Sequence, residues 1–200
     1  SQKSATDESY NIIYADNDFS RAKITFRVVL DNQHKILGFF LADMKNKPAI
    51  LNPGESEDTV HTADGGVLYG TLKHPKGKEH CPVVLIIAGS GPTDRNGNNP
   101  MLPAGQGFSY EQLAEGLAAN GIASLRYDKR FVGESKQFGK PVENVTLNDF
   151  LADAVAWIGH LERSGQFSGV SVVGHSEGAL LGIALANNTN IKNLVSLSGP

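Results

Sequence analysis

The sequence has a single cysteine, Cys81, among its 200 residues. No internal disulfide can form, so the fold must be held together by a hydrophobic core, and 40% hydrophobic residues are available to build one. Long apolar runs are also lacking, because the longest strongly apolar run, residues 83–88, is far shorter than the roughly 20 residues that span a bilayer. The sequence therefore predicts a core-stabilised fold with no membrane-spanning helix.

Charge of either sign is not in large excess. The 18 Lys and Arg against 21 Asp and Glu give a net charge of −3, and no dense basic block is present. This balance argues against nucleic acid or an anionic membrane as a partner. No signal peptide is visible at the start of the chain, but one removed before Ser1 would leave no trace, so cytoplasmic and exported locations both stay open, as does the oligomeric state.

The first part of the chain has the pattern of a β-hairpin. Apolar and polar residues alternate over 23–30, residues 31–34 supply turn chemistry, and 36–41 form a second apolar run. Polar, Pro- and Gly-containing segments at 45–48 and 52–55 follow and predict a linker. We therefore expect an N-terminal β-rich segment with its linker over 1–53 and a separate domain over 54–200.

The second part alternates between strand and helix patterns. A hairpin with strands 58–62 and 67–73 turns at Asp64-Gly65-Gly66, the strongest short-range hairpin signal. Strands are then expected at 82–88, 122–127, 169–174 and 191–197, and helices at 108–120, 147–161 with Thr146 as cap, and 177–186. Such alternation predicts an α/β fold with a mostly parallel sheet and helices on both faces, ending after its sixth strand.

The segment Gly174-His175-Ser176-Glu177-Gly178 lies between the end of a predicted strand and the start of a helix. This is the setting of a nucleophile elbow, a sharp turn that lifts a serine hydroxyl above the carboxyl ends of the strands. The residues two before and two after the serine pass very close together, which explains glycine at 174 and 178. We therefore expect Ser176 to be a nucleophile, the alternative being an ordinary Gly-rich turn.

A nucleophilic serine needs N–H groups that stabilise the oxyanion. One donor would be the backbone N–H of Glu177, directly after the nucleophile. The other should come from the loop after strand 82–88, where Gly89 and Gly91 flank Ser90, and we expect the Ser90 N–H to be this donor. A phosphate-binding function for this loop is disfavoured, because it lacks the full glycine spacing and no helix directly follows it.

Three ordered motifs together resemble the bacterial α/β-hydrolases of the esterase, dienelactone-hydrolase and serine-aminopeptidase type. They are the elbow, the loop Gly89-Ser90-Gly91-Pro92 with residues 94–98, and residues 127–130 with 133–135. The resemblance covers about residues 55–200 and implies the α/β-hydrolase fold. The hairpin at 29–40 is similar to the end of a small α+β domain, nuclear-transport-factor-like, that often precedes such hydrolases. Phe131 departs from the family, which usually has glycine there, so the local turn is in question and an aromatic wall near the pocket is expected.

Other polar residues are expected to be structural. Asp128 and Arg130 suit a buried ion pair that ties their loop to its neighbours. Strand alternation turns His175 away from the nucleophile. A zinc site from His74, His80 and Cys81 does not match common ligand spacings, so no metal or cofactor is expected.

No Asp or His follows Ser176 in the sequence, and the only later acid is Glu177. The resemblance places the triad acid and histidine after two further strands, beyond Pro200, so we expect the chain to be a fragment. The predicted function is a serine esterase that acts on a small ester through an acyl-enzyme. One alternative is a serine aminopeptidase or oligopeptidase that binds the substrate amino group through Glu177 or Glu134, and another is a non-catalytic binding module.

Overall fold

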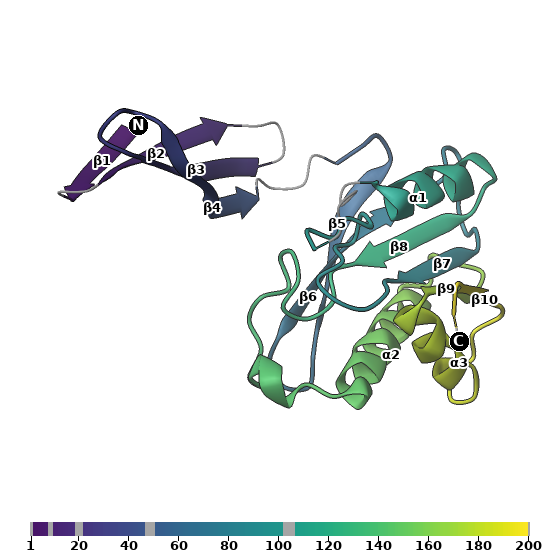
Figure 1. The fold of residues 1–200 in the computed structure, drawn as a ribbon. Helices are drawn as coiled ribbons and strands as arrows, with labels where there is room; N and C mark the ends of the chain where they lie inside the picture. Colours follow the sequence, from purple (N-terminus) through teal and green to yellow (C-terminus); the bar gives the residue numbers. More distant parts are fainter. Residues whose placement is uncertain (1, 8–9, 19–21, 47–50, 102–106, 200) are drawn as a thin grey trace. The chain divides into compact units, whose positions relative to one another are not determined.

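A computed structural model describes residues 2–7, 10–18, 22–46, 51–101 and 107–199. The chain divides into two compact units, residues 1–50 and 51–200. Figure 1 shows that strands make up the first unit and that the second combines a sheet with helices.

The first unit contains an antiparallel sheet with the strand order β1-β2-β3-β4. Its strands are β1 (Gln2–Asp7), β2 (Tyr10–Asp18), β3 (Ala22–Leu30) and β4 (Ile36–Asn46). The predicted hairpin is the β3–β4 pair, but β4 continues past the apolar run through a register shift opposite Thr25 and Phe26. Lys45 and Asn46, predicted as linker, are therefore strand residues, and positions 47–50 lie outside the described residues.

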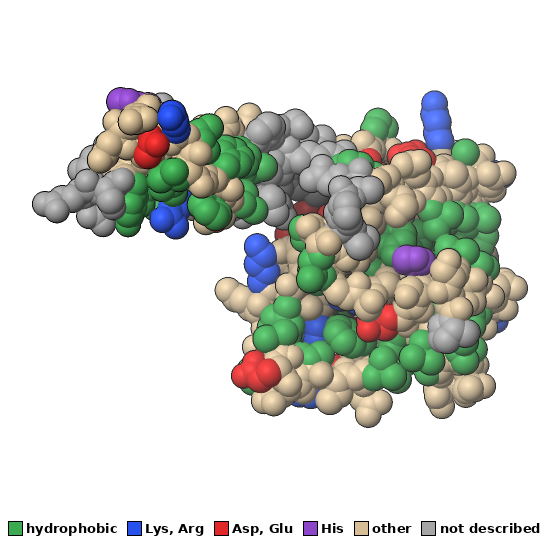
Figure 2. Space-filling model, in the orientation of Figure 1, with side chains coloured by type: hydrophobic (Ala, Val, Ile, Leu, Met, Phe, Trp, Pro, Cys, Tyr) green, Lys and Arg blue, Asp and Glu red, His purple; other side chains and the backbone are tan. Residues whose placement is uncertain are grey.

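Apolar side chains lie at the surface of this first sheet (Figure 2). The register places Ile13, Val28 and Phe39 side by side, and the Phe39 ring stacks on Phe26 at 4.9 Å between centroids although Phe39 is 61% exposed. The described residues of this unit form strands and turns without a helix. The resemblance to a nuclear-transport-factor-like domain stays a prediction.

The second unit is built on a six-stranded sheet with the order β10-β9-β7-β8-β6-β5. Its strands are β5 (Glu55–His61), β6 (Val67–Lys73), β7 (Val83–Ile87), β8 (Ala123–Tyr127), β9 (Val170–His175) and β10 (Leu194–Leu197). β10, β9, β7 and β8 run parallel, whereas the β5–β6 hairpin joins β8 in the antiparallel direction. The predicted α/β architecture with a mostly parallel sheet is confirmed.

The helices are α1 (Ser109–Ala119), α2 (Leu147–Arg163) and α3 (Glu177–Ala186), with a short 3₁₀ turn at Val142–Asn144. Side chains of β7 alternate between two cores: Leu85 packs with residues of α2 and α3, and Val84 packs with Tyr110 of α1. Helices therefore cover both faces of the sheet (Figure 1), which explains why its central strand β7 is continuously apolar.

The helix ends follow local chemistry in most places. Thr146 and Asp149 form a reciprocal capping box at the start of α2, which confirms the predicted role of Thr146 as the cap. Ser109 begins α1, but the residue before it, Phe108, is left-handed with φ of 48° and provides no side-chain cap. No helix among the described residues is long and apolar enough to span a membrane.

Candidate active site

Ser176 stands at the turn between β9 and α3, where it adopts φ 51° and ψ −117°. A positive φ is costly for a residue with a Cβ atom, so the surrounding structure must impose it. The Ser176 N–H donates to the Leu197 carbonyl of β10 at 2.9 Å, and the Ser176 carbonyl accepts the Ala179 N–H at 2.9 Å. The elbow is thus fastened to the neighbouring strand on one side and to its own helix on the other.

Glycine at both ends of the elbow is a steric requirement. A Cβ atom added at Gly174 would lie 2.1 Å from the Gly178 carbonyl oxygen, and one added at Gly178 would lie 2.3 Å from the Ile87 carbonyl oxygen of β7. These contacts involve backbone, which cannot move aside as a side chain can. The spacing in the sequence reflects this close passage of chain segments.

The loop after β7 reaches the elbow at Gly89. A Cβ atom added there would lie 3.3 Å from the Ser176 Cβ and 3.1 Å from the His175 Nδ1, so glycine allows the loop to lie against the serine. Ser90 follows directly and is exposed. Gly91 adopts φ 72°, a conformation that favours glycine. The structure thus brings together the two segments that sequence analysis selected for the nucleophile and the oxyanion donors.

Glu177 is the first residue of α3, and the first N–H groups of a helix have no acceptor within it. Its N–H therefore lies at the positive end of the helix dipole, next to Ser176. This position suits a donor to developing negative charge.

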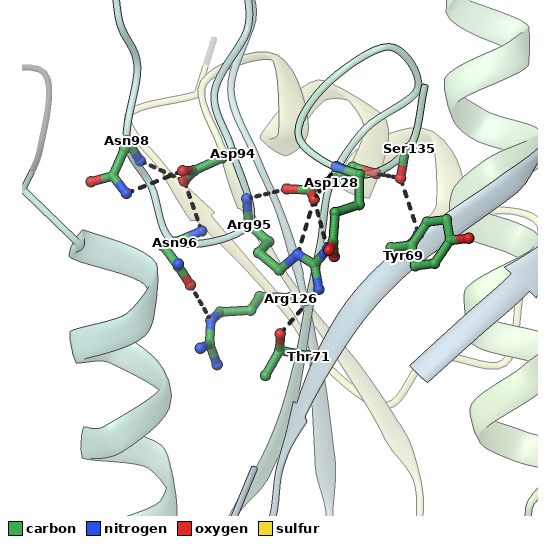
Figure 3. A network of polar contacts seen from close by, with 10 residues as sticks. Tyr69, Thr71, Asp94, Arg95, Asn96, Asn98, Arg126, Asp128 and Ser135 are labelled. Carbon is green, nitrogen blue, oxygen red and sulfur yellow. Dashed lines mark hydrogen bonds and ion pairs between the residues drawn. The ribbon is translucent and has the colours of Figure 1, made fainter. Parts of the chain in front are cut away.

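Two polar clusters shape the loop after β7 (Figure 3). The Asp94 Oδ1 atom accepts the N–H groups of Asn96 at 2.9 Å and Asn98 at 2.8 Å, which closes a tight turn. Arg95 is buried and donates to Asp128 through its backbone N–H at 2.8 Å and its Nε at 3.0 Å, while Glu134 also accepts from its guanidinium. These contacts attach the loop to the segment that follows β8.

Asp128 and Arg130 are both buried, but each pairs with a residue other than its expected neighbour. Asp128 binds Arg95, whereas Arg130 donates to Asp153 of α2 at 2.6 and 2.7 Å and to Asp64 of the β5–β6 turn at 3.0 Å. The hydrogen bond to Asp153 raises the pKa of Arg130, and the neighbouring Asp64 adds to this effect. The expected pair is thus two separate pairs, whose partners belong to different elements.

His175 is held by Tyr110 of α1, whose hydroxyl lies 2.8 Å from the His175 Nδ1. The same hydroxyl accepts the Gly89 N–H at 3.3 Å, and burial raises the pKa of Tyr110, so the phenol stays neutral. Within the part of the chain that the structure describes, no histidine hydrogen-bonds with the Ser176 hydroxyl. His175 thus has the structural contacts expected for it, whereas Tyr110 had no signal in the sequence.

Phe131 has φ 66°, the left-handed conformation for which glycine is suited. The turn nevertheless forms, with the Phe131 N–H donating to the Ser135 carbonyl at 2.6 Å. The phenyl ring packs against Phe138 at 5.1 Å between centroids. The expectation of a pocket wall stays a prediction.

Lys129 is the residue that sequence reasoning overlooked. It directly follows Asp128 at the carboxyl end of β8, and its side chain is only 4% exposed. Its Nζ donates to the Gly89 carbonyl at 2.6 Å and to Glu177 Oε1 at 2.9 Å. The available signal was its position, because the carboxyl ends of adjacent parallel strands meet at one edge of a sheet.

His74, His80 and Cys81 were considered as zinc ligands from the sequence. Among the residues with described positions, no group of three or more His, Cys, Asp and Glu side chains is arranged to hold a metal. His74 instead stacks on Phe167 at 5.6 Å between centroids, and Cys81 is buried.

Comparisons with known proteins found relatives in sequence and in structure. Residues 106–200 match the family model described as serine aminopeptidase, S33. The chain is 29% identical over 189 residues to Esterase EstD of Thermotoga maritima, a match that covers 91% of this chain and 43% of that protein. It therefore spans less than half the length of this curated relative.

Solved structures resemble the chain as well. The α/β hydrolase GrgF of Penicillium superposes with a TM-score of 0.58 at 16% identity over 72% of this chain and 46% of that one. An esterase of Pyrococcus furiosus superposes with a TM-score of 0.56 at 20% identity over 73% of this chain and 52% of that one.

Proposed function

The chain has the α/β-hydrolase fold, and we propose that it carries the nucleophile and oxyanion donors of a serine hydrolase that cleaves carboxylic esters. The observation that carries this proposal is the elbow, where Ser176 is held at φ 51° between glycines whose approach to backbone leaves no room for a Cβ atom. A serine held in this conformation at the carboxyl edge of a parallel sheet is the arrangement that acyl transfer uses.

In the proposed reaction the Ser176 oxygen bonds to the ester carbonyl carbon while its proton passes to a histidine base. The N–H groups of Glu177 and Ser90 stabilise the oxyanion, which collapses and expels the alcohol with that proton. Water then attacks the acyl-enzyme and releases the acid. The proposal takes the histidine and its acid from outside the 200 residues, in the order Ser, acid, His.

An aminopeptidase is the second candidate, because the matching family model carries that description. Binding a substrate α-amino group needs a carboxylate that is not neutralised by a cation. Glu177 is paired with Lys129 and Glu134 with Arg95, so neither residue proposed for this role has an unpaired carboxylate. The name of the Thermotoga relative also favours an esterase.

The test compares hydrolysis of p-nitrophenyl acetate and alanine p-nitroanilide by the natural protein that contains this chain, together with labelling by a fluorophosphonate probe. We expect turnover of the ester and labelling of Ser176, both lost in Ser176→Ala. Ser168→Ala is the matched control, because Ser168 is exposed and precedes β9 at the opposite end from the elbow. Unchanged labelling in Ser176→Ala contradicts the proposed nucleophile, faster anilide cleavage supports the peptidase, and absence of both labelling and turnover supports a binding module.

A further inference from the structure

A buried cation lies between the two segments that carry the proposed oxyanion donors. The ammonium of Lys129 donates to the Gly89 carbonyl at 2.6 Å and to the Glu177 carboxylate at 2.9 Å, and it lies 5.3 Å from the centroid of the Phe150 ring. The Lys129 side chain is 4% exposed and that of Glu177 is 30% exposed. Burying a charge is costly unless polar partners compensate it, and here the two partners belong to the two segments of the site.

The first partner of the ammonium, the Gly89 carbonyl, belongs to the same peptide group as the Ser90 N–H, one of the two proposed oxyanion donors. The Gly89 carbonyl and the Ser90 N–H share one planar unit and point in opposite directions across it. A cation held at 2.6 Å from the carbonyl oxygen therefore fixes the direction in which the Ser90 N–H points. It also polarises the amide, since hydrogen bonds at one end of a peptide group strengthen those at the other.

The second partner of the ammonium is the carboxylate of Glu177, whose backbone N–H is the other proposed oxyanion donor. Glu177 supplies its backbone N–H to the oxyanion site, and its carboxylate is held by the same ammonium. Lysine suits this role because its compact ammonium has three donors that can be directed to separate acceptors. The loop after β7 and the start of α3 are thereby connected through one atom.

We propose that Lys129 is a positioning residue of the oxyanion hole, whose ammonium fixes the Gly89–Ser90 peptide relative to Glu177 so that both N–H groups converge beside Ser176. This inference rests on the proposed serine hydrolase function. It assigns Lys129 no proton transfer and no contact with the substrate.

A matched control is available within the same sheet. Lys73 is also buried, with a side chain 7% exposed, and it also donates to one carbonyl, that of Pro53 at 2.9 Å, and to one carboxylate, that of Glu115 at 2.6 Å. Lys73 pairs in register with Ser124, near the start of β8, whereas Lys129 follows the end of that strand. The two lysines make the same kinds of contact but lie near opposite ends of β8.

The kinetic test compares Lys129→Met with Lys73→Met in the natural protein that contains this chain, using p-nitrophenyl acetate. Removing a whole oxyanion donor costs about 100- to 1000-fold in kcat, so disturbing the position of a donor should cost less, about 10- to 100-fold. We expect that loss in kcat for Lys129→Met with KM within about threefold of the parent. Lys73→Met should keep the parent kcat even where its melting temperature falls. Equal kcat values for the two folded variants would overturn the proposal.

A second measurement is independent of activity. In the ¹⁵N-labelled chain, we expect Lys129→Met to shift the Ser90 amide resonance and to speed its hydrogen exchange, while Lys73→Met leaves both unchanged. If the parent hydrolyses no ester, the proposed function fails and the Ser90 amide alone decides the positioning role. An unchanged Ser90 amide in Lys129→Met overturns that role whatever the activity.

A third variant covers the case in which Lys129→Met does not fold. Glu177→Gln removes the charge that holds the ammonium and keeps an acceptor oxygen, and charge-assisted hydrogen bonds are about twice as strong as neutral ones. We expect kcat to fall about three- to tenfold with KM unchanged. A folded Glu177→Gln with the parent kcat and the parent Ser90 amide resonance would overturn the proposal.

Discussion

Replacing Gly178 by alanine should destabilise the second unit although alanine is the better helix former. A Cβ atom at position 178 would lie 2.3 Å from the Ile87 carbonyl oxygen and 2.8 Å from that of Ala88, and both distances are below the 3.4 Å at which ordinary contact begins. Ile87 ends β7 and Ala88 directly follows it, and β7 is hydrogen-bonded to β8 on one side and β9 on the other. The strand cannot retreat, so α3 must move.

The expected magnitude follows from two opposing effects. Overpacking against backbone costs about 3 kcal/mol, and removing a helical glycine returns about 1 kcal/mol. The net loss of about 2 kcal/mol lowers the melting temperature by about 4–8 °C for a unit of this size. Gly116→Ala in α1 is the matched control, because its Cβ atom would meet nothing within 4 Å, and it should raise the melting temperature by about 2–4 °C.

The assay is the thermal transition followed by tryptophan fluorescence. Among the 200 residues the one tryptophan is Trp157, which is fully buried in the core of the second unit, so the change in its fluorescence reports the unfolding of this unit. A Gly178→Ala variant that melts at or above the parent temperature would refute the steric reasoning at the elbow. Its kcat should also fall, because α3 carries the Glu177 N–H.

Three further predictions concern single side chains. Asp128→Asn should lower the free energy of unfolding by about 3 kcal/mol in urea titrations, because it leaves Arg95 buried without its main counter-charge; a loss below about 1 kcal/mol would contradict this. Hydrogen bonds from Lys140 and Thr146 lower the pKa of Asp149, so its stabilising contribution is complete above about pH 4 and is lost as the pH falls below that value. Asp149→Asn should therefore lose less stability than the parent between pH 6 and pH 3, and equal losses would rule this out. Cys81, the only cysteine, is buried and should react with Ellman's reagent in urea but not in the native protein, whereas fast native labelling would show that its burial is wrong.

Much of the second unit could be predicted from local patterns. The continuous apolar run at β7 indicates a strand covered on both faces, and the helical spacing behind Thr146 indicates α2. The elbow could be located because both glycines stand within one short motif around Ser176, and a Cβ atom at Gly174 would meet the Gly178 carbonyl oxygen of the same motif. The first unit was less predictable, because β4 continues into polar residues and the strands β1 and β2 carry weaker alternation.

The charge pairs of the site could not be predicted in the same way. Asp128 and Arg130 are close in sequence and were expected to pair, yet Asp128 binds Arg95, 33 residues earlier, and Arg130 binds Asp153, 23 residues later. Which partner a buried charge meets depends on the direction in which each side chain leaves its loop and on which element packs above it. Neither quantity is encoded in a short window of sequence.

The amino-acid sequence by itself determined the α/β class of this protein and the position of Ser176 in a strand–turn–helix elbow flanked by glycines, because periodicity and the close passage of residues 174 and 178 act over a few residues. Only the tertiary structure showed that Gly178 is required by its approach to the Ile87 carbonyl of β7. Only the tertiary structure decided that Gly89 lies against Ser176, that Tyr110 holds His175, and that the Lys129 ammonium joins Gly89 to Glu177. These contacts arise because parallel packing brings the carboxyl ends of β7, β8 and β9 to one edge, and residues as distant in sequence as Gly89 and Glu177 then share one site.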